Sequence, residues 1–167
     1  MQKLSSKIFT LLVLALLGTL VYLTVFSDGL GQAPALKIQT AEQTLNLAKP
    51  KKPVLVNFWA TSCPGCVMEM PHLAEMKKRL GDRFELIAVS MVYDPQSQVQ
   101  KFIQNHDYPF TYVMDSKGKI AKAFGGIQLT PTSFLIAPNG KIVYQKIGEL
   151  DFQQVEARIK QMSPQIQ

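Results

Sequence analysis

The sequence predicts an α/β sandwich in which helices flank a central mixed β-sheet. Short, almost continuous apolar runs, which are typical of strands buried on both faces, alternate with segments whose apolar residues recur at helical spacing. Near the C-terminus, Pro138, Asn139 and Gly140 separate two strand-like runs and favour a tight hairpin turn. We therefore expect the last two strands to run antiparallel, in a chain whose 167 residues allow one domain and an appendage.

The first half of the predicted domain contains a hairpin, a strand and a helix. Residues 36–47 alternate loosely between apolar and polar side chains, which predicts a small hairpin or edge strands. Residues 54–60 read VLVNFWA and predict a buried strand. Residues 64–80 predict a helix that ends at Gly81. The apolar residues that recur at helical spacing in it are Met68, Leu73, Met76 and Leu80.

The same alternation continues through the second half. Strands are expected, in chain order, at residues 84–91, 110–114, 132–137 and 141–147. Helices are expected at residues 95–106, at 119–124 and in a C-terminal segment whose apolar stripe is Phe152, Val155, Ile159 and Met162. The first of these helices places Val99, Phe102 and Ile103 on one face.

An apolar segment precedes the domain. Residues 8–26 contain no charge and no proline, and as a helix rising about 1.5 Å per residue they would span roughly the 30 Å hydrocarbon core of a bilayer. Lys3 and Lys7 precede this run, which favours an N-terminus held in the cytoplasm. A cleaved signal peptide is the alternative, because Ala33-Pro34-Ala35 resembles a cleavage site.

These features predict the organisation of the chain. We expect a membrane anchor at residues 1–26, a flexible tether at 27–35 and a thiol-bearing domain at 36–167. The protein would cross the cytoplasmic membrane once, with its catalytic domain on the periplasmic side. The net charge of +6 is scattered, and no aromatic residues are interleaved beside its basic clusters, so we expect no nucleic-acid partner.

The only two cysteines, Cys63 and Cys66, stand between the predicted buried strand and the predicted helix. Pro64 suits the first helical position, so Cys63 lies at a helix N-terminus, where free N–H groups and the helix dipole stabilise a thiolate. Cys66 follows one turn later, within bridging distance. This arrangement is typical of a dithiol exchanger in which Cys63 attacks a disulfide and Cys66 resolves the mixed disulfide.

A purely structural disulfide and a zinc site both account less well for the pair. A structural disulfide that closes so short a loop constrains the unfolded chain little. A zinc site needs four ligands, and His72 and His106 do not have finger-like spacing. An exported domain also lies where disulfides form and persist, so a redox function suits the predicted location.

The stretch VLVNFWATSCPGCVMEMP resembles the active-site strand and helix of the thioredoxin superfamily. It is most similar to the membrane-anchored, extracytoplasmic thiol–disulfide oxidoreductases of the TlpA/ResA type. The resemblance covers residues 36–162 and includes Pro71 after the cysteines and Pro131 in LTPTSFLI. An additional β-α segment at residues 84–114, between the active-site helix and Pro131, belongs to the same pattern.

The resemblance implies a thioredoxin-like sandwich and roles for several residues. It implies a cis Thr130–Pro131 bond packed across from the cysteines, with the Thr130 backbone free to pair with an incoming peptide as a short strand. It also implies that Pro71 bends the active-site helix and that Trp59 supports the active-site strand. We expect no metal, and no cofactor other than the redox-active disulfide.

Glu69 lies three residues after Cys66, so the two side chains project from the same side of the helix. Cytoplasmic thioredoxins carry a buried aspartate at the position of Asn57, which cannot exchange a proton. Glu69 instead matches the acidic residue of the ResA-type proteins. A partly buried carboxylate there would have a raised pKa and could shuttle the proton of Cys66. An ordinary helix glutamate is the alternative.

The predicted function is thus exchange of electrons with protein cysteines outside the cytoplasm. The resemblance implies a reductant of exported client proteins, of the cytochrome or oxidase maturation type, that a membrane thiol-transfer reductase recharges; a net oxidant stays open. The alternative is a membrane-tethered copper(I) chaperone that uses the two cysteines with nearby soft ligands. Its candidate ligands are Met68, Met70, His72 and the more distant His106.

Overall fold

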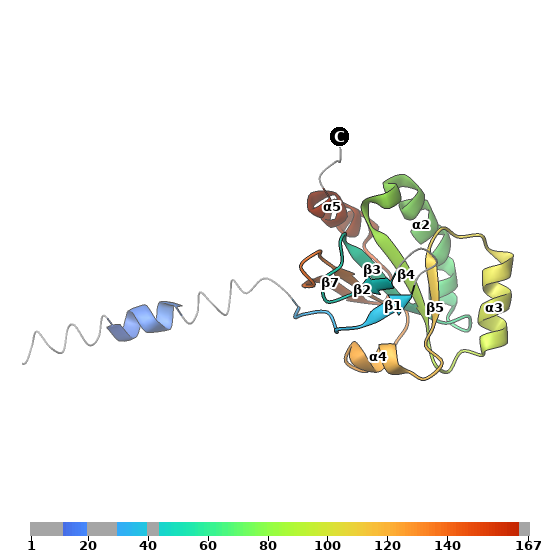
Figure 1. The fold of residues 1–167 in the computed structure, drawn as a ribbon, viewed down its shortest axis with the longest axis horizontal. Helices are drawn as coiled ribbons and strands as arrows, with labels where there is room; N and C mark the ends of the chain where they lie inside the picture. The colour runs from blue at the N-terminus through green and yellow to red at the C-terminus, as the bar shows by residue number, and fades with distance from the viewer. Residues whose placement is uncertain (1–11, 20–29, 40–43, 164–167) are drawn as a thin grey trace, which may run out of the picture.

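The computed structural model describes residues 12–19, 30–39 and 44–163, and its centre is a five-stranded sheet (Figure 1). The strands are β1 Lys37–Gln39, β2 Thr44–Asn46, β3 Val54–Trp59, β4 Glu85–Ser90, β5 Thr111–Met114, β6 Thr132–Ile136 and β7 Ile142–Ile147. The helices are α2 Pro64–Leu80, the 3₁₀ turn η1 Gly81–Arg83, α3 Gln96–Asn105, α4 Lys119–Ala123 and α5 Phe152–Met162. The strands and α-helices lie where the sequence predicts elements of their kind.

The central sheet is mixed, as predicted, with strand order β5-β4-β3-β6-β7. β3 pairs parallel with β4, and β4 pairs parallel with β5, whereas β6 is antiparallel to both β3 and β7. β1 and β2 form a separate antiparallel pair, in agreement with the predicted hairpin. Because β6 runs against β3 and β4, the ends of β3 and β4 lie at the same edge of the sheet as the start of β6. This edge carries the candidate site.

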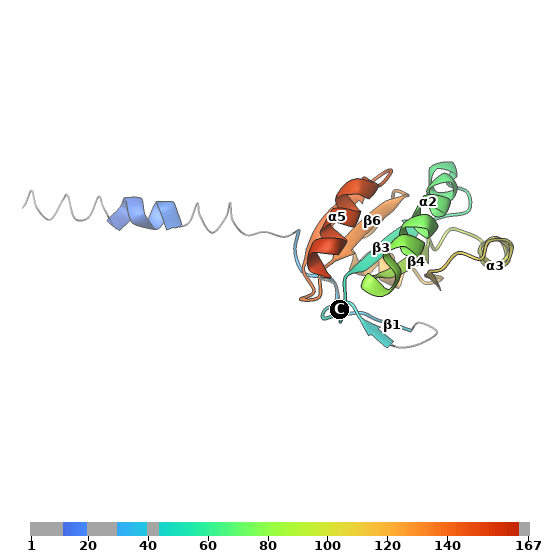
Figure 2. The same ribbon diagram turned by 90° about the horizontal axis from the view of Figure 1, so that it is seen from above.

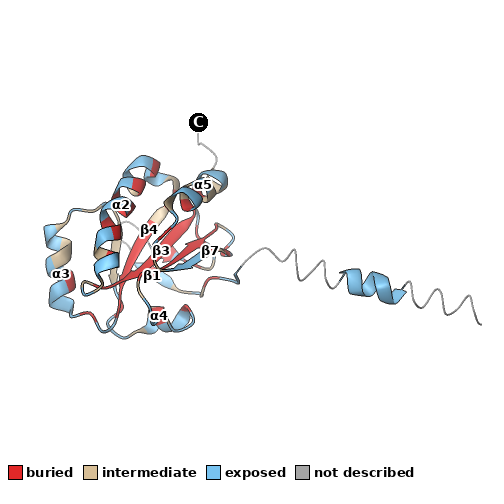
Figure 3. Ribbon diagram, turned by 180° about the vertical axis from the view of Figure 1, so that it is seen from behind, coloured by how far each residue is buried: buried red, intermediate tan, exposed pale blue. Residues whose placement is uncertain are grey.

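Two apolar clusters bury the faces of the sheet. α2, α3 and α5 pack on one face, and α4 packs with the β1–β2 pair on the other. Figure 2 shows α2 and α5 over one face and β1 on the opposite side. The central strands are buried while the outer surfaces of the helices are exposed (Figure 3). The sheet is therefore covered on both faces, which explains why its strands read as continuous apolar runs.

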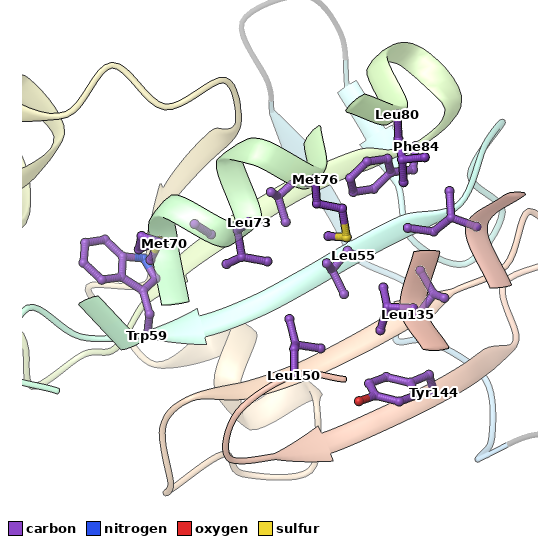
Figure 4. Packing of buried hydrophobic residues seen from close by; sticks show 14 of the residues in the cluster. Leu55, Trp59, Met70, Leu73, Met76, Leu80, Phe84, Leu135, Tyr144 and Leu150 are labelled. Atoms are coloured by element: carbon purple, nitrogen blue, oxygen red, sulfur yellow. The ribbon is translucent and has the colours of Figure 1, made fainter. Parts of the chain in front are cut away.

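α2 buries three of the four residues that the sequence predicts on its apolar stripe, and it buries Met70 in place of the fourth. Met70, Leu73 and Met76 are fully buried and face the strand that carries Leu55 (Figure 4). Met68, expected on this stripe, is wrong as a core residue because 69% of its surface is exposed. Two residues along an α-helix correspond to a rotation of about 200°, so Met68 and Met70 cannot both face the sheet.

The turn between β6 and β7 is held against the β1–β2 pair. Gly140 has a positive φ of 80°, which suits the predicted hairpin turn. A β-carbon at this position would lie 2.0 Å from the carbonyl oxygen of Ala48, so the close approach requires glycine.

The predicted tether is partly attached to the domain. Residues 30–33 lie along the start of β7, where the Ala33 N–H donates a hydrogen bond to the Gly140 carbonyl at 2.8 Å. Ala33 is buried. The boundary at residue 36 stays a prediction, but the chain contacts the sheet before that residue.

The predicted membrane anchor lies largely outside the described residues. Residues 12–19 are helical, and the remainder of residues 8–26 is not described. Within the described parts of the chain, no helix is long and apolar enough to cross a membrane. The anchor therefore stays a prediction from the sequence.

The two methionines of α2 provide a test of its orientation. Met70→Ala should lower the free energy of unfolding by about 2–5 kcal/mol, because truncating a fully buried side chain leaves a cavity. Met68→Ala, the matched control, should change it by less than about 0.5 kcal/mol. Denaturant unfolding of the full chain, followed by the fluorescence of Trp59, measures both; equal effects would contradict the orientation of α2.

Candidate active site

Cys63 and Cys66 form a disulfide at the start of α2, with their Cα atoms 5.3 Å apart. Cys63 is the N-cap of the helix, and its Sγ accepts a hydrogen bond from the Cys66 N–H at 3.2 Å. Pro64 occupies the first turn, as predicted. Cys63 is partly exposed, whereas Cys66 is only 1% exposed. A large incoming molecule can therefore reach Cys63 but not Cys66.

The Thr130–Pro131 segment lies directly beside the exposed cysteine. Its peptide bond is cis, as the resemblance implies, and the Thr130 carbonyl oxygen lies 3.5 Å from Cys63 Sγ. The Gly148 N–H donates to the Pro131 carbonyl at 2.8 Å, and the Thr132 hydroxyl donates to the Leu129 carbonyl at 2.7 Å. These bonds hold the segment from both sides, so that the Thr130 backbone faces the disulfide.

Glu69 is buried on the sheet side of α2, one turn after Cys66, and is 3% exposed. Its Oε1 accepts a hydrogen bond from the Leu150 N–H at 2.7 Å, and its Oε2 accepts one from Asn57 Nδ2 at 3.1 Å. Burial raises the pKa of Glu69 above its ordinary value, against the lowering effect of these two bonds. Nearby Glu149 raises this pKa further, and His72 lowers it.

Asn57 is a hydrogen-bond partner of Glu69, and Ser133 is a second partner of Asn57; the sequence alone did not reveal either contact. Asn57 Nδ2 also donates to Ser133 Oγ at 2.9 Å, and both residues are almost fully buried. The sequence held a signal, because a polar residue inside a buried strand requires a partner. It did not hold the identity of that partner, because β6 lies far from β3 along the chain.

Asp94 is a second buried carboxylate that the sequence did not reveal. It lies in the β4–α3 loop, and its Oδ2 accepts from the Thr61 N–H at 2.6 Å while Oδ1 accepts from the Thr61 hydroxyl at 2.5 Å. Thr61 stands two residues before Cys63, so these bonds fix the loop that leads into the disulfide. Nearby, the hydroxyl of the exposed Tyr93 lies 3.2 Å from Thr130 Oγ1.

The remaining predicted residues, Trp59 and Pro71, lie in the strand that leads to the disulfide and in the helix that follows it. Trp59 ends β3 fully buried, and its ring packs against Phe102 and Tyr112 at centroid distances of 4.9 and 5.9 Å. Pro71 lies inside α2, which continues to Leu80. The bend expected at Pro71 stays a prediction.

The four candidate copper ligands do not gather around the cysteines. Met70 is buried in the core and Met68 is exposed. The His72 ring lies against Phe152 at 5.8 Å, and the His106 ring stacks on another aromatic side chain. In the described part of the chain, no three His, Cys, Asp or Glu side chains are placed to hold a metal ion.

Comparison with known proteins relates this geometry to a family. The Redoxin family model matches residues 30–159. The chain is 35% identical over 114 residues to the thiol-disulfide oxidoreductase ResA of Bacillus thuringiensis subsp. konkukian, a match that takes in 68% of this chain. The chain thus spans 65% of the length of that relative.

A sequence and a crystal structure from Bacillus subtilis are also similar to this chain. The sporulation thiol-disulfide oxidoreductase A is 30% identical over 128 residues, which cover 74% of this chain and 77% of the relative. The crystal structure of StoA superposes with a TM-score of 0.64 at 28% identity, over 75% of this chain and 97% of StoA. Both the sequence and the fold of this chain are therefore similar to those of thiol–disulfide oxidoreductases.

The raised pKa of Glu69 predicts a pH-dependent stability. A group whose pKa is higher in the folded state stabilises the fold fully below its ordinary value, here 4.5, and loses that contribution as the pH rises through the raised pKa. Glutamine does not ionise. Relative to the wild type, Glu69→Gln should therefore gain stability as the pH rises from below 4.5 into the neutral range.

Denaturant unfolding of the oxidised protein at a series of pH values measures this difference. Glu75→Gln, which changes an exposed glutamate of the same helix, is the matched control. A stability difference between wild type and Glu69→Gln that stays constant with pH would contradict the raised pKa.

Proposed function

The chain belongs to the Redoxin family, and from that premise we propose that it is a thiol–disulfide oxidoreductase that reduces disulfides in exported proteins. The observation that carries the proposal is the unequal burial of the two bonded cysteines, with Cys63 partly exposed at a helix start and Cys66 buried behind it. In this proposal the exposed Cys63 sulfur forms the mixed disulfide with the client protein, and the buried Cys66 sulfur then releases the client from it. The similarity to ResA supports the same activity.

The reaction begins from the reduced protein. The Cys63 thiolate, stabilised at the N-terminus of α2, attacks one sulfur of a client disulfide. A bond forms between Cys63 and that sulfur, and the other client sulfur leaves as a thiolate. The client backbone pairs with Thr130, whose carbonyl lies 3.5 Å from Cys63 Sγ and is thus next to any sulfur bound there.

The second half of the reaction requires deprotonation of Cys66. Its thiol gives a proton to the Glu69 carboxylate one helical turn away. The Cys66 thiolate then attacks Cys63 Sγ, the Cys63–client bond breaks, and the second client thiolate leaves. Two electrons have passed to the client, and the protein holds the Cys63–Cys66 disulfide. The buried position of Glu69 suits this role, because a raised pKa allows the carboxylate to exchange protons nearer neutral pH.

The proposal extends to location and partners. The apolar run at residues 8–26 would anchor the protein in the cytoplasmic membrane with its domain outside the cytoplasm. There the disulfide needs a source of electrons, which a membrane thiol-transfer reductase would provide. The clients would be exported proteins whose cysteines must stay reduced, such as apocytochromes or metal-site proteins of oxidases.

Serine substitutions separate the roles of the two cysteines. Cys63→Ser should lower the rate of insulin disulfide reduction by roughly 10³-fold or more, because the attacking sulfur is lost. Cys66→Ser should accumulate a mixed disulfide with a peptide substrate, since nothing resolves it. Ser62→Ala, at an exposed neighbouring position, is the control. Mass spectrometry detects the trapped complex; trapping through Cys66 in Cys63→Ser instead would overturn the assignment.

The reduction potential of the pair tests the direction of electron flow. Equilibration of the full chain with dithiothreitol buffers should give a value near that of thioredoxin, about −270 mV, as expected for a reductant. A value near that of the strong oxidant DsbA, about −120 mV, would overturn the reductant role and leave the exchange activity in place.

A further inference from the structure

Glu69 belongs to a buried hydrogen-bond network whose members come from four parts of the fold. Glu69 belongs to α2, Asn57 to β3, Ser133 to β6, and the Leu150 N–H follows β7. Asn57, Glu69 and Ser133 are 1%, 3% and 0% exposed. Groups so deeply buried must satisfy their hydrogen bonds with one another.

In the orientation that the Asn57 amide has in the structure, these donors and acceptors fit the ionised form of Glu69. Asn57 Nδ2 uses its two hydrogens on Glu69 Oε2 and Ser133 Oγ. Asn57 Oδ1 is buried and has no hydrogen-bond partner among the described residues. The Glu69 carboxylate thus accepts hydrogen bonds from Asn57 Nδ2 and the Leu150 N–H, while the Asn57 Oδ1 acceptor makes none among the described residues.

Protonation of Glu69 changes this balance. Oε1 faces the backbone N–H of Leu150, which is a fixed donor, so the proton must reside on Oε2. The Oε2–H group and an Asn57 N–H would then point at each other, and their bond would be lost. Rotation of the Asn57 amide by half a turn removes the conflict, because Oδ1 then takes the place of Nδ2. The Ser133 hydroxyl can donate as well as accept, so it can follow the rotation.

We propose that Asn57 is a positioning residue whose side-chain amide turns over when Glu69 takes the proton of Cys66. In the turned state, Asn57 Oδ1 accepts hydrogen bonds from Glu69 Oε2–H and from the Ser133 hydroxyl. Glu69 is then hydrogen-bonded both before and after it takes the proton, and Ser133 serves both states. The inference rests on the proposed role of Glu69 in thiol exchange. It adds the two residues, Asn57 and Ser133, that allow Glu69 to take up and release a proton reversibly.

The other groups near Glu69 must be separated from this effect. On α2 the charged neighbour is His72, and after β7 it is Glu149; these lower and raise the pKa of Glu69 respectively. Cys66 lies one turn before Glu69 on α2. From β3 and β6, the facing groups are the neutral Asn57 and Ser133. Titration of the Glu69 carboxyl group in His72→Gln and in Glu149→Gln therefore shows how much of its pH dependence comes from these two neighbours.

The first experiment observes Glu69 directly in the oxidised full chain, in which neither cysteine titrates. Carbon-13 NMR of the Glu69 carboxyl group gives its titration midpoint. Asn57→Leu removes an amide whose hydrogen bond to the carboxylate is roughly twice as strong as its bond to the protonated carboxyl group, so the midpoint should rise by about one pH unit. Ser133→Ala should raise it by less, because the amide loses only its second partner. Ser90→Ala, at a buried serine of β4 outside this set, should leave it unchanged.

The second experiment observes the amide itself. In the wild type, the side-chain ¹⁵N and ¹H resonances of Asn57 should shift with the midpoint of Glu69, and this shift should vanish in Glu69→Gln. The pH profile for reduction of a peptide disulfide by Asn57→Leu should move upward by the same amount as the carboxyl midpoint. A purely structural role for Asn57 would lower the rate equally at every pH.

Two outcomes overturn the inference: an unchanged Glu69 midpoint in folded Asn57→Leu, or Asn57 resonances that do not respond when Glu69 titrates. If Asn57→Leu does not fold, the inference is still tested by the response of the wild-type Asn57 resonances to pH and by the Glu69 titration midpoint in Ser133→Ala. If the wild type reduces no peptide disulfide, the proposed function fails. The two NMR measurements on the oxidised protein would still test the coupling between Asn57 and Glu69.

Discussion

The central position of β3 is the constraint on which the site depends. This strand pairs parallel with β4 and antiparallel with β6, so its end lies beside the end of β4 and the start of β6. The loops that follow or precede these strands carry Cys63, Asp94 and Pro131 to one edge of the sheet. A slip of one residue in β3 would turn Asn57 to the opposite face, away from Glu69. The same pairing thus sets both the backbone and the polar core of the site.

The site divides between an exposed half and a buried half. Cys63 and the Thr130 backbone lie at the surface, where another molecule can reach them. Cys66 and Glu69 lie on the buried side of α2, where low polarity strengthens each hydrogen bond. One helix serves both halves, because Cys63 caps its N-terminus and its first turn leads into the core.

The order and type of the elements could be predicted because their signals are local. Apolar runs, helical spacing and the turn at Gly140 are all contained within short windows of sequence. The orientation of α2 could not be read from the sequence in the same way, because Met68 and Met70 are both apolar and each fits a helical stripe. Packing against Leu55 decided in favour of Met70. The sequence did not predict that residues 30–33 pair with β7, because the hydrogen bonds that hold them join backbone atoms and do not depend on particular side chains.

The sequence by itself determined the chemistry of the cysteine pair, because a cysteine at a strand–helix junction with a second one turn later is defined by local geometry. It also placed Glu69 on the same side of the helix as Cys66. Only the tertiary structure decided what surrounds them. The partners of Glu69 and Asn57 lie 12, 76 and 81 positions away along the chain, and the Thr130 carbonyl lies 67 positions from Cys63. Such contacts depend on strand order and register, which no short window of sequence contains.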